Sequence, residues 1–204
     1  MDPEDRKQFL IAMYNTMWGN IDRHILVVWQ SVGVLAGAIT ALALVEKQVF
    51  SLDLAVTLIV MVGIWQVAHV LDASWWFSRN LRIIANIERQ FLTASDVREI
   101  HYYFSERRAP KMLDHQKIQL YFGSAVTGIV LLYHFYKRVM PGLCNSFVYF
   151  ELRMAVPYIV FGIGLIGLFA FHRHHQKEFN KLNDLSPGKD IGPPLQSNPP
   201  TLKG

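Results

Sequence analysis

Four stretches of the chain are apolar for long enough to cross a lipid bilayer as helices. They are residues 25–45, 54–73, 118–136 and 154–171. A membrane-spanning helix needs roughly 20 apolar residues, and the first stretch contains no charged residue at all. The eight residues from 46 to 53 are too few to hold a domain. We therefore expect an all-α integral membrane protein whose four transmembrane helices form two hairpins, over 25–77 and 118–171.

The apolar pattern continues beyond the second span. Apolar residues recur there at steps of three and four, with arginines between them: Phe77, Leu81, Ile84, Ile87 and Phe91. This spacing predicts that the second span continues as one long helix. Thr93 or Ser95 then caps a second amphipathic helix, and together they form a helical extension over residues 78–117.

The two chain ends differ in pattern. Residues 1–24 predict an amphipathic helix, because Pro3 suits a first helical position and apolar residues follow at helical spacing. Residues 172–204 begin as a basic segment. From Ser186 onward, proline, glycine and polar residues predict disorder.

Charge sets the expected orientation. Sixteen of the 20 Lys and Arg residues lie in the N-terminal segment, the middle segment and the tail, and four lie in the two short loops. By the positive-inside rule both termini and the 78–117 segment are cytoplasmic, in an inner membrane, with the first span as anchor in place of a cleaved signal peptide. The same topology explains the net charge of +4 better than nucleic-acid binding does.

Three polar residues at steps of three end the second span: Gln66, His69 and Asp72. At 1.5 Å per residue, Gln66 and His69 lie roughly 18 and 22 Å deep in a core about 30 Å thick, and Asp72 lies near its boundary. Polar residues inside a span either join helices by hydrogen bonds or line a pore, gate or proton-sensitive site. Both alternatives stay open for Gln66 and His69.

Other spans supply polar residues that belong with this pair. Thr127 and His134 share one face of the third span, and Gln30 lies in the first. Together with Gln66 and His69 they form either a wet pore lining or a dry interior tied by hydrogen bonds.

Self-assembly is expected from two features. Gly33 and Gly37 form a GxxxG pattern that permits close helix approach, and two amphipathic cytoplasmic helices need a partner surface. In the fourth span, Pro157 and three glycines are consistent with a kink or close packing. The arginines of the cytoplasmic helices are the expected gating or partner-binding residues: Arg79, Arg82, Arg89 and Arg98.

Enzymatic and metal sites are not expected, and no cofactor is implied. No nucleotide-binding, serine-hydrolase or zinc-protease motif occurs. His172, His175 and Glu178 share a spacing that suits a metal, but the intervening cations favour a basic cluster at the lipid surface. The Arg108 to His115 spacing of some helical ribonucleases is interrupted by Pro110. The lone Cys144, in the second external loop, cannot form an intrachain disulfide.

The layout resembles small bacterial membrane effectors and accessory proteins of antiviral defence systems, of the two- or four-span type. The resemblance lies in Asp22-Arg23-His24 at the membrane entry, the tight first hairpin, and the helix that leaves as Trp75-Trp76-Phe77. It implies a homo-oligomeric channel or pore-forming effector that disrupts membrane potential, with a nucleic acid or nucleotide as one conceivable trigger. The alternative is a non-conducting membrane sensor or scaffold that recruits a cytoplasmic partner protein.

Overall fold

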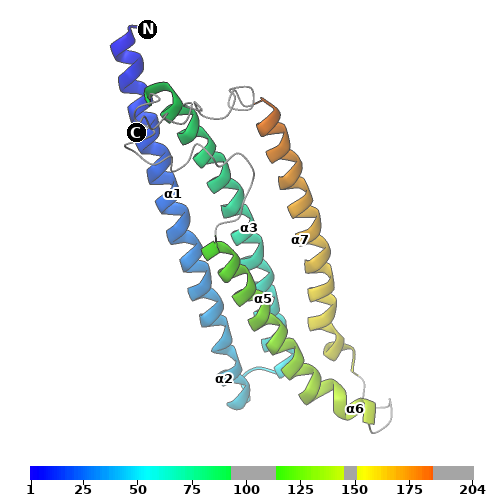
Figure 1. Cartoon of the computed structure of the whole chain (residues 1–204). Coiled ribbons are helices and arrows are strands. Elements are labelled where there is room, and N and C mark those ends of the chain that lie inside the picture. Colours follow the sequence, from blue (N-terminus) through cyan, green and yellow to red (C-terminus); the bar gives the residue numbers. More distant parts are fainter. Residues whose placement is uncertain (93–113, 145–150, 186–204) are drawn as a thin grey trace, which may run out of the picture. The chain divides into compact units, whose positions relative to one another are not determined.

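The computed structural model describes residues 1–92, 114–144 and 151–185, and every element in these ranges is helical. The elements are α1 (Pro3–Ile39), α2 (Ala41–Glu46), α3 (Leu52–Phe91), α5 (Asp114–His134), the π-helical turn η1 (Phe135–Val139), α6 (Met140–Cys144) and α7 (Leu152–Leu185) (Figure 1). The all-α prediction is confirmed. The helix expected after Thr93, with Arg98, and the tail from Ser186 lie outside the described residues.

In the ranges that the structure describes, four helical stretches are long and apolar enough to cross a membrane. They are Pro3–Glu46, Leu52–Phe91, Asp114–Leu143 and Leu152–Leu185. Each contains one of the four stretches identified by hydropathy. The predicted number of membrane-length helices is therefore confirmed, and it is compatible with a multi-pass membrane protein.

Local sequence explains where these helices begin and end. α1 is one continuous helix, so the expected N-terminal helix and most of the first span form a single element. At the turn before α3, Gln48 adopts a positive φ of 58°, and the Ser51 hydroxyl then accepts a hydrogen bond from the Leu54 amide at 3.2 Å. Such capping satisfies a backbone donor that a helix start leaves free. α3 runs to Phe91, as the apolar spacing predicted.

The chain divides into two compact units, and α1, α3 and α7 each contribute to both. The four-helix unit comprises Leu26–Ala73 and Leu113–His174. The three-helix unit comprises Met1–Ile25, Ser74–Met112 and His175–Gly204.

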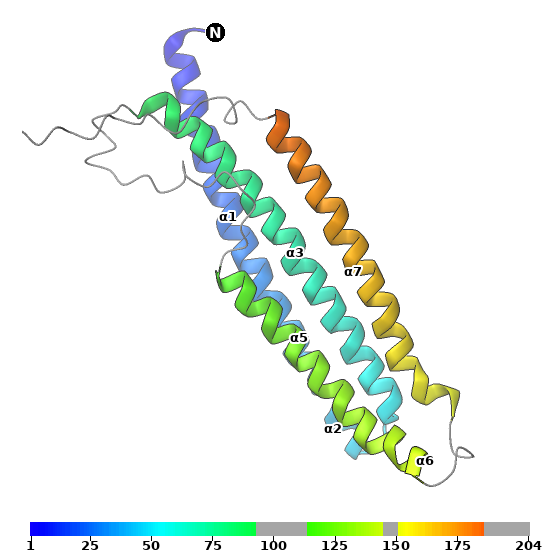
Figure 2. The ribbon, with the colours of Figure 1, turned by 45° about the vertical axis from the view of Figure 1, so that its right-hand side comes forward.

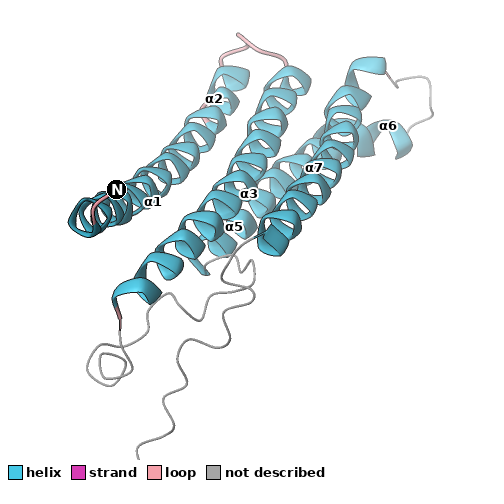
Figure 3. Ribbon diagram, turned by 90° about the horizontal axis from the view of Figure 1, so that it is seen from above, coloured by secondary structure: helices cyan, strands magenta, loops and turns pink. Residues whose placement is uncertain are grey.

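In the four-helix unit, α3 is the central helix. Figures 2 and 3 show it between α1 and α7, with α5 alongside. Val28 of α1 packs on Val70 of α3. Gly164 of α7 lies so close to Ile64 that an added Cβ would be 2.2 Å from the Ile64 side chain. Close packing is thus found at Gly164, whereas no atom of the described residues lies within 4 Å of a Cβ added at Gly162 or Gly167.

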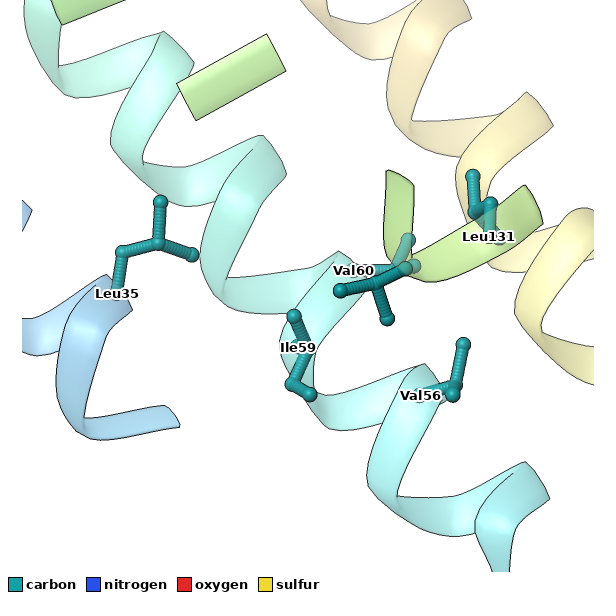
Figure 4. Close-up of a cluster of buried hydrophobic side chains, with 6 residues drawn as sticks. Leu35, Val56, Ile59, Val60 and Leu131 are labelled. Carbon is teal, nitrogen blue, oxygen red and sulfur yellow. The ribbon is translucent and has the colours of Figure 1, made fainter. Parts of the chain in front are cut away.

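Six buried side chains from three helices form an apolar cluster in this unit, which we call the apolar layer. Its members are Leu35, Val56, Ile59, Val60, Val130 and Leu131. Figure 4 shows Val56 and Val60 of α3 on the side of Leu131, and Leu35 across from them on α1. Tyr158 of α7 packs against the cluster. The layer therefore joins α1, α3, α5 and α7.

Burial on α5 is the reverse of what a water-soluble helix shows. Several of its large apolar side chains are exposed, with Ile118 67%, Ile129 65% and Leu132 69% accessible. Four of its buried residues are polar, and they are Gln116, Gln119, Thr127 and His134. Apolar residues normally form the buried stripe of a helix in water, so this arrangement suits an apolar surrounding.

The three-helix unit is held by aromatic and polar contacts. The Tyr14 hydroxyl donates to the Glu88 carboxylate at 3.4 Å, and the His24 and Trp76 rings stack with centroids 5.9 Å apart. Trp75 meets the His175 ring at 5.7 Å. The apolar stripe predicted along α3 faces inward at Phe77, Leu81, Ile84 and Ile87, which are all buried.

Candidate functional site on the polar face of α5

The polar residues buried along α5 extend over most of the helix. From Gln116 to His134 the helix rises about 27 Å, at 1.5 Å per residue. This length is close to the roughly 30 Å hydrocarbon thickness of a bilayer. We call Gln116, Gln119, Thr127 and His134 the polar face of α5.

Gln66 of α3 packs directly on this face. It is fully buried, and a Cβ added at Gly123 would lie 2.0 Å from its Oε1 atom. Within the described residues, neither Oε1 nor Nε2 of Gln66 has a hydrogen-bond partner, and the same holds for Gln119. Burying an amide without hydrogen-bond partners costs free energy. A second conformation in which water reaches the amide would remove that cost.

One helical turn along, Thr127 meets Gly63 of α3. A Cβ added at Gly63 would lie 2.1 Å from Thr127 Oγ1 and 3.2 Å from Thr127 Cβ. The Thr127 hydroxyl donates to the Gly123 carbonyl at 2.8 Å, which satisfies it within α5. The two glycines thus allow α3 and α5 to approach closely, as small residues do between membrane helices.

A charged cluster centred on Asp53 occupies the end of α5 near His134. His134 is fully buried, and its Nε2 lies 2.9 Å from Asp53 Oδ1 while its Nδ1 lies 2.9 Å from the Tyr158 hydroxyl. Arg138 donates from Nε to Asp53 Oδ1 and from Nη2 to Asp53 Oδ2, both at 3.1 Å. This bidentate geometry is the strongest that an arginine makes with a carboxylate.

The outer side of this cluster balances its charge. Arg153 lies 3.6 Å from Asp53 Oδ2 and also pairs with Glu151, which lies 3.7 Å from Arg138. Two carboxylates therefore face two guanidinium groups. Such pairing offsets the cost of burying the Asp53 carboxylate.

The sequence pattern identified His134 as a polar residue of the third span, but not the residues that surround it. Asp53, Arg138 and Tyr158 were not among the predicted site residues. The sequence did contain part of the evidence for this cluster, because His134 and Arg138 stand four residues apart and so share one helical face. Asp53 could not be matched to them, since helix pairing is a tertiary property.

The other predicted polar residues lie elsewhere. Gln30 is exposed on α1, and His69 is half-buried and stacks on Trp65 of its own helix with centroids 5.3 Å apart. The structure therefore places Gln66 and Thr127 at the contact between α3 and α5 and His134 at the far end of α5, while Gln30 is exposed and His69 stacks on Trp65.

The arginines expected to gate or bind a partner belong to the three-helix unit. Arg79 lies over the Trp76 ring at 5.2 Å, and the buried Arg82 lies 6.0 Å from the Phe179 ring. Arg89 is half-buried. Both ring contacts have the geometry of cation–π interactions.

In the described ranges, no group of three or more His, Cys, Asp or Glu side chains is placed to hold a metal ion. The arrangement offers hydrogen bonding, charge pairing and an apolar layer. Comparison with protein-family models, curated proteins and solved structures finds no match to this chain.

Proposed function

We propose that this chain is a multi-pass inner-membrane protein that assembles with copies of itself into a channel or pore-forming effector and dissipates membrane potential. Four membrane-length helices and the apolar outer surface of α5 support the membrane setting. The distribution of Lys and Arg supports cytoplasmic termini and a cytoplasmic extension of α3. The resemblance to defence effectors supports a role in bacterial antiviral defence.

The observation that carries the proposal is a pair of buried amides, Gln66 of α3 and Gln119 of α5, that make no hydrogen bond in the described part of the chain. Polar residues that serve only to join helices should form hydrogen bonds to the neighbouring helix. Gln66 and Gln119 are buried and make none in the described part of the chain. A state in which α3 and α5 separate and water enters would satisfy both amides, and would line a path with the polar face of α5.

The apolar layer supplies the closed gate in this proposal. Val130 and Leu131 interrupt the polar face of α5 between Thr127 and His134. An apolar constriction blocks ions by excluding water, so the path conducts only when the layer opens. Gln30, exposed on α1, joins such a path through a second copy of the chain.

The test is ion flux from liposomes that contain the purified protein. Replacing Gln66 or Gln119 with Met keeps side-chain length and removes the polar atoms. We expect each variant to reduce flux at least tenfold while remaining folded. Gln176→Met is the matched control, because Gln176 is exposed on α7 and donates to Asn180 of its own helix.

Two outcomes would contradict the proposal. One is the absence of flux under every applied voltage, pH and nucleotide condition. The other is flux that survives in both glutamine variants. Absence of flux together with loss of a bound partner protein in Arg79→Ala and Arg82→Ala would favour the non-conducting scaffold instead.

A further inference from the structure

Asp53 connects three parts of the four-helix unit that are far apart in the sequence. Its carboxylate lies at the start of α3. It contacts His134 at the end of α5, Arg138 in η1 and Arg153 in α7. Only 5% of the Asp53 side chain is accessible. It is therefore a buried junction at which α3, α5 and α7 meet.

This junction lies directly beside the apolar layer. Val56, a member of the layer, follows Asp53 by one helical turn, and Leu131 precedes His134 by the same step. Tyr158 belongs to both, because its ring packs on the layer while its hydroxyl contacts His134 and lies 3.5 Å from the Leu131 carbonyl. Movement of α5 away from Asp53 would thus displace the layer as well.

The π-helical turn places the arginine of the junction. η1 interrupts the α-helical course of α5 immediately after His134, and Arg138 lies within it. π-helical turns are uncommon and occur often at functional sites. Because His134 and Arg138 both reach Asp53 Oδ1, a change in this turn alters both contacts together.

We propose that the Asp53 junction is a latch that holds the apolar layer closed. This inference rests on the proposed function, since it assigns the regulation of the same path. With the junction intact, α3 and α7 hold the end of α5 and water is excluded from the layer. With the Asp53 carboxylate replaced by an uncharged amide, Arg138 loses its bidentate anionic partner, and a partly buried charge left without that partner favours hydration. The layer then opens to water.

Thiol accessibility tests the latch without measuring current. In a Cys144→Ser background, Val60→Cys places a thiol in the apolar layer, where the native side chain is fully buried. A water-soluble, membrane-impermeant thiol reagent is applied to both faces of protein reconstituted in liposomes. We expect Asp53→Asn and Arg138→Gln each to raise the labelling rate at least tenfold. Asp53→Glu, which keeps the carboxylate, should label at no more than about twice the parent rate.

Two controls separate the latch from general damage. Lys137→Gln changes the exposed neighbour of Arg138 in η1 and should leave labelling unchanged. Ile84→Cys places a thiol in the buried interior of the three-helix unit, which should stay protected in Asp53→Asn. Labelling of both Ile84→Cys and Val60→Cys would show that Asp53 only maintains the fold, and would overturn the latch.

The two proposals fail in different ways. If Val60→Cys stays protected in Asp53→Asn and Arg138→Gln while the unmodified chain conducts ions, the latch is wrong and the channel stands. If Val60→Cys becomes accessible but no variant conducts, the latch stands as a conformational device and the channel proposal fails.

Discussion

At the residue scale, three glycines lie very close to a polar or branched side chain of a neighbouring helix. Gly63 faces Thr127, Gly123 faces Gln66, and Gly164 faces Ile64. Gly33 and Gly37, which form the GxxxG pattern, have nothing within 4 Å of an added Cβ in the single chain. Sequence spacing therefore could not tell which glycines the fold uses internally.

We predict that Gly63→Ala lowers the stability of the purified protein by about 1–3 kcal/mol, because overpacking forces a stiff neighbour to move. The Thr127 side chain cannot turn away as a unit, since an added Cβ would also lie 3.2 Å from its Cβ atom. Thermal unfolding in detergent measures the effect. Gly128→Ala is the control on α5, where nothing lies within 4 Å, and it should be neutral or stabilising.

Gln66 and Gly123 form a pair that can be tested by a double-mutant cycle. Gly123→Ala alone should destabilise the protein, because the added Cβ would overlap the buried Gln66 amide. Gln66→Ala shortens that side chain, so the double variant should be less destabilised than the sum of the single variants. Additive losses would show that Gln66 does not limit the approach of α5 to α3.

At the element scale, the helices are longer than the membrane spans found by hydropathy. The second apolar stretch is half of α3, and the fourth is half of α7, which continues to Leu185. The periodicity of apolar residues predicted the continuation of α3 correctly. The apolar periodicity did not predict the π-helical turn that follows α5 at Phe135–Val139.

α7 should depend on one glycine out of three for its packing on α3. We predict that Gly164→Ala destabilises the fold, since a Cβ there would lie 2.2 Å from Ile64 Cδ1 and 2.8 Å from Cγ1. Gly162→Ala should not, because its Cβ position is open. The unfolding temperatures of the two variants test this prediction. An equal decrease in both would mean that α7 does not pack on α3 through Gly164 as the structure shows.

At the scale of the whole molecule, the proposed topology predicts which segments face the cytoplasm. Alkaline phosphatase fused after Gln48 should be active, because it would be exported. Green fluorescent protein fused after Leu92 or at the C-terminus should fluoresce, because both points are expected in the cytoplasm. An active phosphatase fusion after Leu92 would reverse the orientation and would contradict a cytoplasmic extension of α3.

The sequence alone determined the helical class, the four membrane-length segments and the continuous course of α3, because hydropathy and helical periodicity are local properties of the chain. It also identified Gln66, Thr127 and His134 as polar residues in apolar surroundings. Only the tertiary structure decided that Gln66 presses on Gly123, that Asp53 meets His134 and Arg138, and that His134 contacts Tyr158. Those contacts join residues more than 20 positions apart, and their pairing depends on how the helices dock and rotate against one another.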